Sequence, residues 1–257
     1  MKSRRRAVLL AVAATLVLAA ACSSAASGSS SSSSSSSPSG GAPLPAKGGP
    51  PASVPPGSPT KQIAAVNGVV VTEASFTDEL NAIGSVPSFL DATDLKLTPG
   101  SIATRLPSGG FDPGYVRLLL RRRVLVALVE HELALRGVAI SDVCRQAAQS
   151  GMAAALSGDA AEGAAFLAAF PPAYVTQLET WNAEVKQLGA TLSGLPCGTT
   201  DPNAQNRIGT AYSTWQDAAL PVAQIAIDPA YGTWDSATAT IAPPQGAAGT
   251  TTTSTGS

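Results

Sequence analysis

The sequence predicts a mainly helical domain that carries a small β-hairpin and a short C-terminal strand and is preceded by a disordered tether. Apolar residues recur at helical spacing through residues 115–136 and again through 174–188. The pair Asn67-Gly68 separates two β-prone runs, which is the strongest short-range signal for a hairpin. Residues 23–59 are mostly Ser, Gly, Pro and Ala, a composition typical of an unfolded linker.

Residues 1–21 predict a lipoprotein signal peptide. The opening MKSRRR is followed by about fifteen residues without a charge, fewer than the roughly 20 that span a bilayer. Three alanines, residues 19–21, then precede Cys22, and this arrangement resembles the bacterial lipobox, whose cysteine becomes the lipidated first residue of the mature chain. We therefore expect an extracytoplasmic protein attached to the cell membrane by acyl chains on Cys22. The alternative is an ordinary secretory signal in which Cys22 has no such role.

The rest of the chain divides into a tether, a domain and a tail. Residues 22–60, which include the serine run 29–37, have little apolar surface to offset chain entropy and are expected to stay disordered. Residues 61–245, about 185 in all, are enough for one domain with a core. Residues 246–257 are Gly, Ala, Thr and Ser and are expected to fray.

The charge balance argues against nucleic acid as a partner. The formal net charge of the whole chain is −1, and removal of the four cations in residues 1–21 leaves about −5.

The two cysteines of the domain, Cys144 and Cys197, form a disulfide candidate. An extracytoplasmic compartment is oxidising, and a bridge between them would close a loop of about 54 residues, which stabilises by roughly 4 kcal/mol in the chain-entropy treatment. The alternative is a pair of buried free thiols.

The first part of the domain predicts a hairpin followed by a helix. Thr72 stands at a helix N-cap position, and Phe76, Leu80 and Ile83 follow at helical spacing. Residues 84–112 contain several Gly, Pro and Asp and predict an irregular connection with short helical turns.

Residues 115–136 predict the central core helix, which ends at Gly137. The arginines at 121–123 point in different directions on one turn, so we expect a solvated face with salt bridges rather than a binding site.

Two further helices and a strand complete the expected domain. Ser141 is a predicted N-cap for the helix that follows it, and residues 174–188 form an amphipathic stripe. Val222 to Ile227 predicts a strand that stops at Asp228-Pro229.

The order of these motifs resembles the N-terminal domain of SurA-type and PrsA-type foldases. The residues that carry the resemblance are AAVNGVVVTEASFTDEL with its pair Glu79-Leu80, the long helix that passes through "VAISD" into the next one, and the closing IDPAYGTWD. It covers roughly residues 62–150 and 220–244. The resemblance implies that Ala223 to Ile227 lies beside Ala64 to Val71, and that Tyr231 and Trp234 cover apolar surface.

The prolyl isomerase domain of the full foldases has no counterpart in this sequence. That domain uses a pair of histidines, whereas the interval 190–220 is short and contains none, and the chain's one histidine is His131 in the long helix. The sequence also contains no His/Cys cluster with metal-ligand spacing and no phosphate-binding Gly-rich loop. We therefore expect no isomerase activity, no metal and no cofactor.

The resulting expectation is a lipid-anchored chaperone-like protein that binds unfolded or extended segments of secreted polypeptides without catalysis. The candidate client contacts are the large apolar residues Phe89, Leu90, Phe111, Tyr174 and Trp181. One alternative is a structural or assembly lipoprotein that docks a specific envelope partner, and another is a divergent prolyl isomerase.

Overall fold

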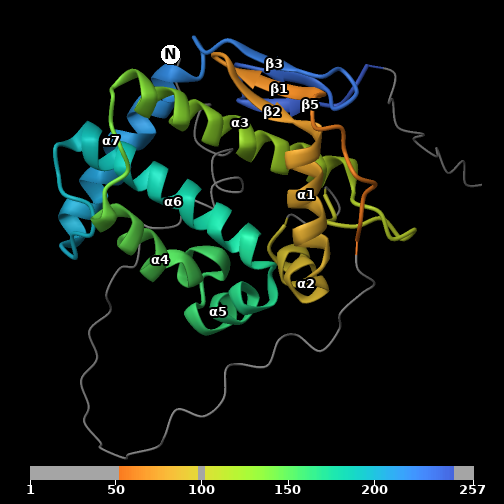
Figure 1. Cartoon of the computed structure of the whole chain (residues 1–257), viewed down its shortest axis with the longest axis horizontal. Coiled ribbons are helices and arrows are strands. Elements are labelled where there is room, and N and C mark those ends of the chain that lie inside the picture. The colour runs from red at the N-terminus through yellow and green to blue at the C-terminus, as the bar shows by residue number, and fades with distance from the viewer. Residues whose placement is uncertain (1–51, 98–101, 246–257) are drawn as a thin grey trace, which may run out of the picture.

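A small antiparallel sheet lies across one side of a set of helices, and the long helix α3 runs directly beneath it (Figure 1). The structure is a computed structural model and describes residues 52–97 and 102–245. In chain order the elements are β1 (Gln62–Val66), β2 (Val69–Thr72), α1 (Glu73–Gly84), α2 (Pro87–Lys96), α3 (Pro113–Leu135), α4 (Asp142–Ser157), α5 (Ala160–Ala169), α6 (Pro172–Ser193), α7 (Pro202–Ala219), β3 (Ile225–Ile227), β4 (Thr233–Asp235) and β5 (Thr240–Ala242). The fold is therefore mainly helical with a small sheet, as the sequence predicts.

The sheet joins the two ends of the domain. Its strand order is β2-β1-β3, and β3 pairs antiparallel with β1 so that Ala64 faces Ile227 and Val66 faces Ile225. In Figure 1 the blue C-terminal strand accordingly lies beside the orange N-terminal hairpin. The hairpin turns at Asn67-Gly68, and both residues have positive φ, 49° and 90°, as the turn requires. The strand pairing expected from the resemblance is confirmed for Ile225 to Ile227.

Side-chain caps fix the starts of several helices. The Thr72 hydroxyl accepts a hydrogen bond from the Ser75 N–H at the start of α1. The Asp112 carboxylate accepts from Gly114 N–H at the start of α3, and the Ser141 hydroxyl accepts from Cys144 N–H at the start of α4. The two N-caps predicted from the sequence, Thr72 and Ser141, are confirmed.

Two helices lie in intervals for which the sequence analysis does not predict a regular helix. The connection 84–112 contains the ten-residue helix α2, which begins at Pro87. The interval 190–220 contains α7, an 18-residue helix whose start is capped by Asp201. The signal for α7 is present in the sequence, because an N-cap aspartate is followed by a proline at N1 and by Ile208, Tyr212 and Trp215 at helical spacing.

The ordered body begins before residue 61. Ala52 is buried and its N–H donates to the Gly84 carbonyl, 3.2 Å away. Asn81 of α1 forms two hydrogen bonds with the backbone of Val54, at 2.9 and 3.2 Å. The prediction that the tether extends to residue 60 is therefore wrong for residues 52–60, because α1 satisfies the backbone of this segment. The predicted signal peptide, the remainder of the tether and the tail 246–257 lie outside the described residues.

The C-terminal hairpin of β4 and β5 is fastened to the helices. Ile241 of β5 is buried, and Tyr231 packs edge-on against Phe76 of α1 with ring centroids 6.1 Å apart. Arg121 of α3 donates from Nε to the Ala239 carbonyl in the turn between β4 and β5. Trp234 is partly buried against the same core. The segment that follows β3 is thus part of the domain, with Tyr231 and Trp234 over apolar surface as expected.

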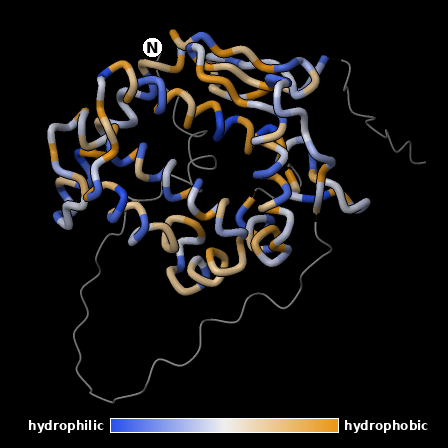
Figure 2. The backbone as a smooth tube through the Cα atoms, in the orientation of Figure 1, coloured by the Kyte–Doolittle hydropathy of each residue, from blue (hydrophilic) through white to orange (hydrophobic). Residues whose placement is uncertain are grey.

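The buried apolar residues form two clusters. The larger lies between the sheet, α1, α2, α4, α5, the N-terminal two-thirds of α3 and the N-terminal half of α6. The smaller lies where the C-terminal halves of α3 and α6 meet α7 and has Val129, Leu133, Leu188 and Tyr212 at its centre. Figure 2 shows a strongly hydrophilic stretch in the middle of α3, between apolar ends. This stretch holds the arginine run, which is flanked on α3 by Leu120 and Val124 of the larger cluster.

Candidate functional site

A buried network of charged and aromatic side chains joins α1, α3 and α6. The carboxylate of Glu79 on α1 is completely inaccessible to solvent and forms ion pairs with Arg122 and Arg123 of α3, whose side chains are 11% and 12% exposed. The Arg123 Nε lies 3.6 Å from Glu79 Oε2. Salt bridges were expected for the arginine run, but the prediction of a solvated face is wrong for Arg122 and Arg123. The reason is that α1 places a buried carboxylate against this turn of α3.

Two aromatic residues of α6 complete the network. Arg122 Nη2 donates to the Tyr174 hydroxyl at 3.0 Å, and the guanidinium carbon of Arg123 lies 4.5 Å from the centre of a Trp181 ring. Burial raises the pKa of Tyr174 to about 12, although the charge of Arg122 acts to lower it. The phenol therefore stays protonated and serves as a hydrogen-bonding partner of the arginine.

The five residues proposed as client contacts are all buried. Tyr174 and Trp181 are 5% and 4% exposed and belong to the network just described. Phe89 packs edge-on against Phe166 and Phe170, and Leu90 is fully buried beside it on α2. Phe111 stacks on Tyr115. These five side chains therefore do not lie on the surface of the folded domain. Helix α2 turns Phe89 and Leu90 into the core, and the two arginines of α3 hold Tyr174 and Trp181.

A pair of carboxylates, those of Glu130 and Glu184, lies close to the network. Glu184 of α6 has a buried Oε2 for which residues 52–97 and 102–245 supply no hydrogen-bond partner. Burial raises the pKa of Glu184 to about 7, Glu130 of α3 acts in the same direction, and Arg123 opposes both. Burial also raises the pKa of Glu130. The ionised form of Glu184 is therefore disfavoured in the folded domain.

This carboxylate predicts a pH-dependent stability. The folded pKa of Glu184 lies above its ordinary value of 4.5, so its favourable contribution is complete below about pH 4.5 and is lost as the pH rises through 7. Glu184→Gln should remove that loss and raise the free energy of unfolding at pH 8 relative to the unchanged protein. We expect a gain on the order of 1 kcal/mol, because partial solvent access screens the charge. Urea unfolding at pH 5 and pH 8 measures it, and an equal pH dependence in both proteins would contradict the assignment.

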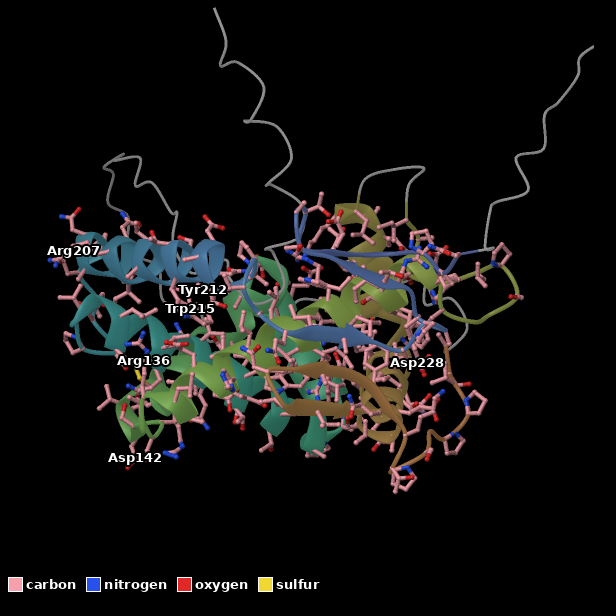
Figure 3. All side chains as sticks on the ribbon, turned by 90° about the horizontal axis from the view of Figure 1, so that it is seen from above. Arg136, Asp142, Arg207, Tyr212, Trp215 and Asp228 are labelled. Atoms are coloured by element: carbon pink, nitrogen blue, oxygen red, sulfur yellow. A yellow bond between two sulfur atoms is a disulfide. The ribbon has the colours of Figure 1, made fainter. Side chains whose placement is uncertain are left out.

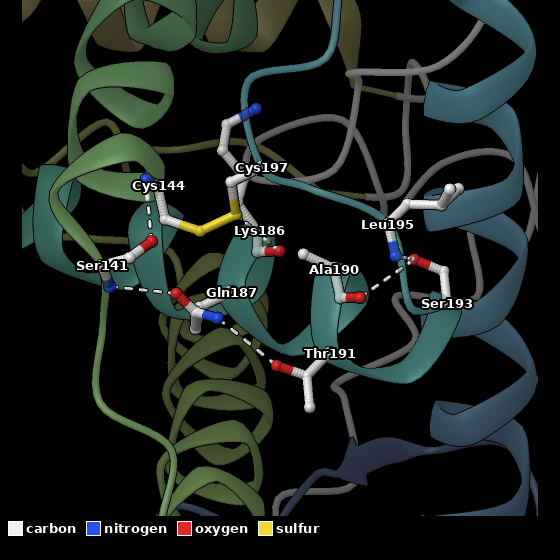
Figure 4. The surroundings of a disulfide bond; sticks show 9 residues. All are labelled: Ser141, Cys144, Lys186, Gln187, Ala190, Thr191, Ser193, Leu195 and Cys197. Atoms are coloured by element: carbon white, nitrogen blue, oxygen red, sulfur yellow. Dashed lines mark hydrogen bonds between the residues drawn. A yellow bond between two sulfur atoms is a disulfide. The ribbon is translucent and has the colours of Figure 1, made fainter.

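A disulfide between Cys144 and Cys197 links α4 to the loop that leads from α6 into α7 (Figure 4). The two Cα atoms are 5.1 Å apart, and Cys144 is buried in the first turn of α4. An open pocket of about 330 Å³ lies beside the bridge. Its polar groups hydrogen-bond to one another, since Ser141 N–H donates to Gln187 and Gln187 donates to Thr191. The pocket therefore presents few free polar groups to a ligand.

The bridge leads to a direct chemical prediction. Alkylation of the unfolded, non-reduced mature protein should modify neither Cys144 nor Cys197, and prior reduction should make both reactive. Mass spectrometry reads the result. Two alkylated thiols without reduction would show that the bridge does not form.

Because the bridge closes a long loop, Cys144→Ser with Cys197→Ser is expected to lower the free energy of unfolding by roughly 2 to 4 kcal/mol.

Potential metal ligands are not grouped in the part of the chain that the structure describes. His131, the chain's one histidine, is half-buried on α3 between two glutamates. Within residues 52–97 and 102–245 there is no group of three or more His, Cys, Asp or Glu side chains placed to hold a metal ion. The same residues contain no helix that is both long and apolar enough to cross a membrane. Cys22 lies outside them.

Comparisons with known proteins leave the family of the chain open. No family model, no curated protein and no solved structure matches this chain.

Proposed function

We propose that this protein is a non-catalytic, chaperone-like binding module of the bacterial cell envelope, related to the N-terminal domain of SurA-type and PrsA-type foldases. The observation that carries the proposal is the pairing of β3 with β1, which brings Ile225 and Ile227 beside the hairpin strand. The resemblance implied this closure between segments about 160 residues apart. The capped helix α1, the long α3 and the Ser141 cap of α4 follow in the same order.

The interval between α6 and the closing strand supports binding without turnover. In the foldases that the chain resembles, a prolyl isomerase domain stands at this place. Here the interval holds the disulfide loop and the single helix α7. His131 lies on α3, away from this interval in the sequence. The proposal is therefore one of holding exposed segments of secreted polypeptides, with no ATP and no bond chemistry.

The disulfide and the N-terminal sequence together support an extracytoplasmic, lipid-anchored location. Persistent disulfides belong to oxidising compartments, and the Cys144–Cys197 bridge joins two elements of the domain. The proposed anchor, Cys22, would be followed by a flexible tether that keeps the domain near the membrane.

Replacement of Cys22 tests the anchor. Cys22→Ser should either prevent processing of the precursor or release the processed protein from the membrane fraction, because the serine hydroxyl does not take the place of the thiol that is lipidated. Cell fractionation followed by intact-mass measurement distinguishes the two results. A processed Cys22→Ser protein that still sediments with membranes would contradict the lipoprotein assignment.

The second candidate function is that of an assembly lipoprotein that docks one folded partner. One observation favours it: the five large side chains expected to bind clients are buried, and the exposed large apolar residues of the described part are distributed over several elements. They are Val70, Leu95, Leu106, Leu135, Val143 and Val222. A small specific interface needs no continuous apolar surface.

An aggregation assay separates the two functions. The domain from residue 52 onward should suppress the aggregation of two unrelated chemically unfolded proteins at near-stoichiometric concentration, in the absence of ATP. Light scattering follows the aggregation, and an unrelated disulfide-bonded protein of similar size and charge is the control. Failure to slow the aggregation of either protein would contradict the holding function and leave the docking function.

A further inference from the structure

Helix α7 covers an apolar surface formed by α3 and α6. We call this the covered surface and define it by Val129 and Leu133 of α3 with Val185, Leu188 and Leu192 of α6. Val129 and Leu188 are fully buried beneath α7. Figure 3 shows Tyr212 and Trp215 on the side of α7 that faces the helices beneath it, and Arg207 near the outer end of α7. Without α7, this surface would be exposed to solvent.

Few side chains of α7 are fully buried for a helix of its length, although the helix packs along α6. Of its 18 residues only Tyr212 is fully buried, while Ile208 and Trp215 are partly buried. The opposite face carries exposed polar residues such as Asn206, Arg207 and Ser213. Elements with few buried apolar contacts open at low free-energy cost, before the domain unfolds as a whole. With one fully buried side chain among its 18 residues, α7 is such an element.

Both ends of α7 are held by fixed points outside the helix. The disulfide at Cys197 ties the loop before α7 to α4, and β3 after α7 pairs with β1. Leu220, which follows the helix directly, is buried. Displacement of α7 would therefore leave the chain attached on both sides and the rest of the fold in place.

The side chains that α7 places on the covered surface follow a helical pattern. Ile208, Tyr212 and Trp215 stand at i, i+4 and i+7, which is the spacing by which amphipathic helices bind in apolar grooves. The Tyr212 and Trp215 rings also contact each other, with centroids 5.6 Å apart. The covered surface is thus already occupied, within the same chain, by a segment with the chemistry of an amphipathic client helix.

We propose that α7 is a displaceable lid, and that the covered surface beneath it binds amphipathic helical segments of client polypeptides that carry large apolar side chains at i, i+4 and i+7. This inference rests on the proposed holding function and names its binding site and substrate class. It explains how the protein could hold clients although the large apolar residues expected to bind them are buried. The covered surface becomes available to a client only when α7 moves aside. The affinity measured for a client is then reduced by the small fraction of molecules in which the lid is open.

Gly189 of α6 offers a way to open the lid. It lies at a close approach of α7 to α6, and a Cβ at this position would stand 2.9 Å from Ile208 Cγ2 and 3.3 Å from the Ile208 carbonyl oxygen. Gly189→Val should therefore push α7 away from α6. The matched control is Gly151→Val on α4, where a Cβ meets only the flexible end of Lys186 at 3.9 Å. The two variants share the same change in helix propensity.

The probe is a fluorescein-labelled peptide with the sequence of residues 202–219 and the change Ile208→Ala, which removes the side chain that the introduced valine would meet. Its binding is measured by fluorescence anisotropy with the domain from residue 52 onward. Gly189→Val should bind it roughly tenfold or more tightly than the unchanged protein and Gly151→Val do. A peptide in which Tyr212 and Trp215 are replaced by serine should not bind. Tyr212→Ser in the protein weakens the lid without altering the covered surface, so it should also increase binding. Circular dichroism and a cooperative urea-unfolding transition verify that each variant is folded.

The outcomes separate the lid from the holding function. Equal binding of the peptide by all folded proteins, or binding by none, would overturn the lid. If Gly189→Val binds the peptide but neither it nor the unchanged protein suppresses aggregation, the lid stands and the holding function fails. If the unchanged protein suppresses aggregation and Gly189→Val binds no peptide, the holding function stands and the lid fails.

Discussion

Replacement of Glu79 by alanine is expected to lower the free energy of unfolding by about 3 to 5 kcal/mol, because the two arginines with which it pairs would remain buried without their carboxylate. The Glu79 side chain has no solvent exposure, and Arg122 and Arg123 are nearly as buried. Such a loss is a large part of the 5 to 15 kcal/mol that a domain of this size usually has. Urea unfolding followed by circular dichroism measures it.

Two further variants show whether the loss comes from the unpaired charges. Glu79→Leu combined with Arg122→Met should recover part of the stability, since apolar side chains then replace both members of one buried pair. Glu132→Ala removes the carboxylate of an ion pair with Arg136 whose arginine side chain is 41% exposed, and it should change the stability by about 0.5 kcal/mol at most. If Glu79→Ala were as mild as Glu132→Ala, the buried network would not hold α1 to α3.

Removal of the chain from Asp228 onward is the second large expected effect. This truncation deletes the β4–β5 hairpin, the buried Ile241 and the hydrogen bond from Arg121 to Ala239. It also removes the Asp228 carboxylate, which lies 3.4 Å from Lys61. Loss of the Ile241 side chain alone costs about 2 to 5 kcal/mol in a packed core. A loss of about 3 kcal/mol corresponds to a fall in Tm of roughly 6 to 12 °C for a domain of this size.

The matched control is deletion from Gly246 onward, which leaves the described domain intact and is expected to leave Tm unchanged. Trp234→Ala should give a smaller fall in Tm than the truncation, because Trp234 is only partly buried. Calorimetry of the three proteins gives the comparison. A truncation at Asp228 that melts like the full domain would mean that the closing segment contributes nothing to the core, and the resemblance to the foldases would lose its C-terminal part.

The sequence predicts those turns and helix ends that depend only on residues close by in the chain. The Asn67-Gly68 turn, the Thr72 and Ser141 caps and the glycine after α3 each act within a few residues of themselves, so their identity is sufficient to place them. The partner of β3 is not a local property, and only the resemblance indicated it.

The buried network could not be predicted because its cause is distant in the sequence. Three consecutive arginines are normally solvated, and nothing next to Arg122 indicates that Glu79, 43 residues earlier, will meet it in the core. The arginines that meet Glu79 also contact Tyr174 and Trp181, so the burial of these two aromatic residues has the same distant cause. The position of α7 is also a local property, because its Asp201 cap and the apolar spacing of Ile208, Tyr212 and Trp215 are visible in the sequence.

Crosslinking in intact cells, followed by isolation of the protein with whatever is crosslinked to it, tests the central claim most directly. A photoreactive residue at Ile208 on α7, which approaches the covered surface, is the best position for the crosslinker, with one at the exposed Arg207 as the control. The holding function predicts crosslinks from position 208 to many unrelated secreted polypeptides at low and variable yield. Recovery of one folded partner at constant stoichiometry, or of none, would contradict it.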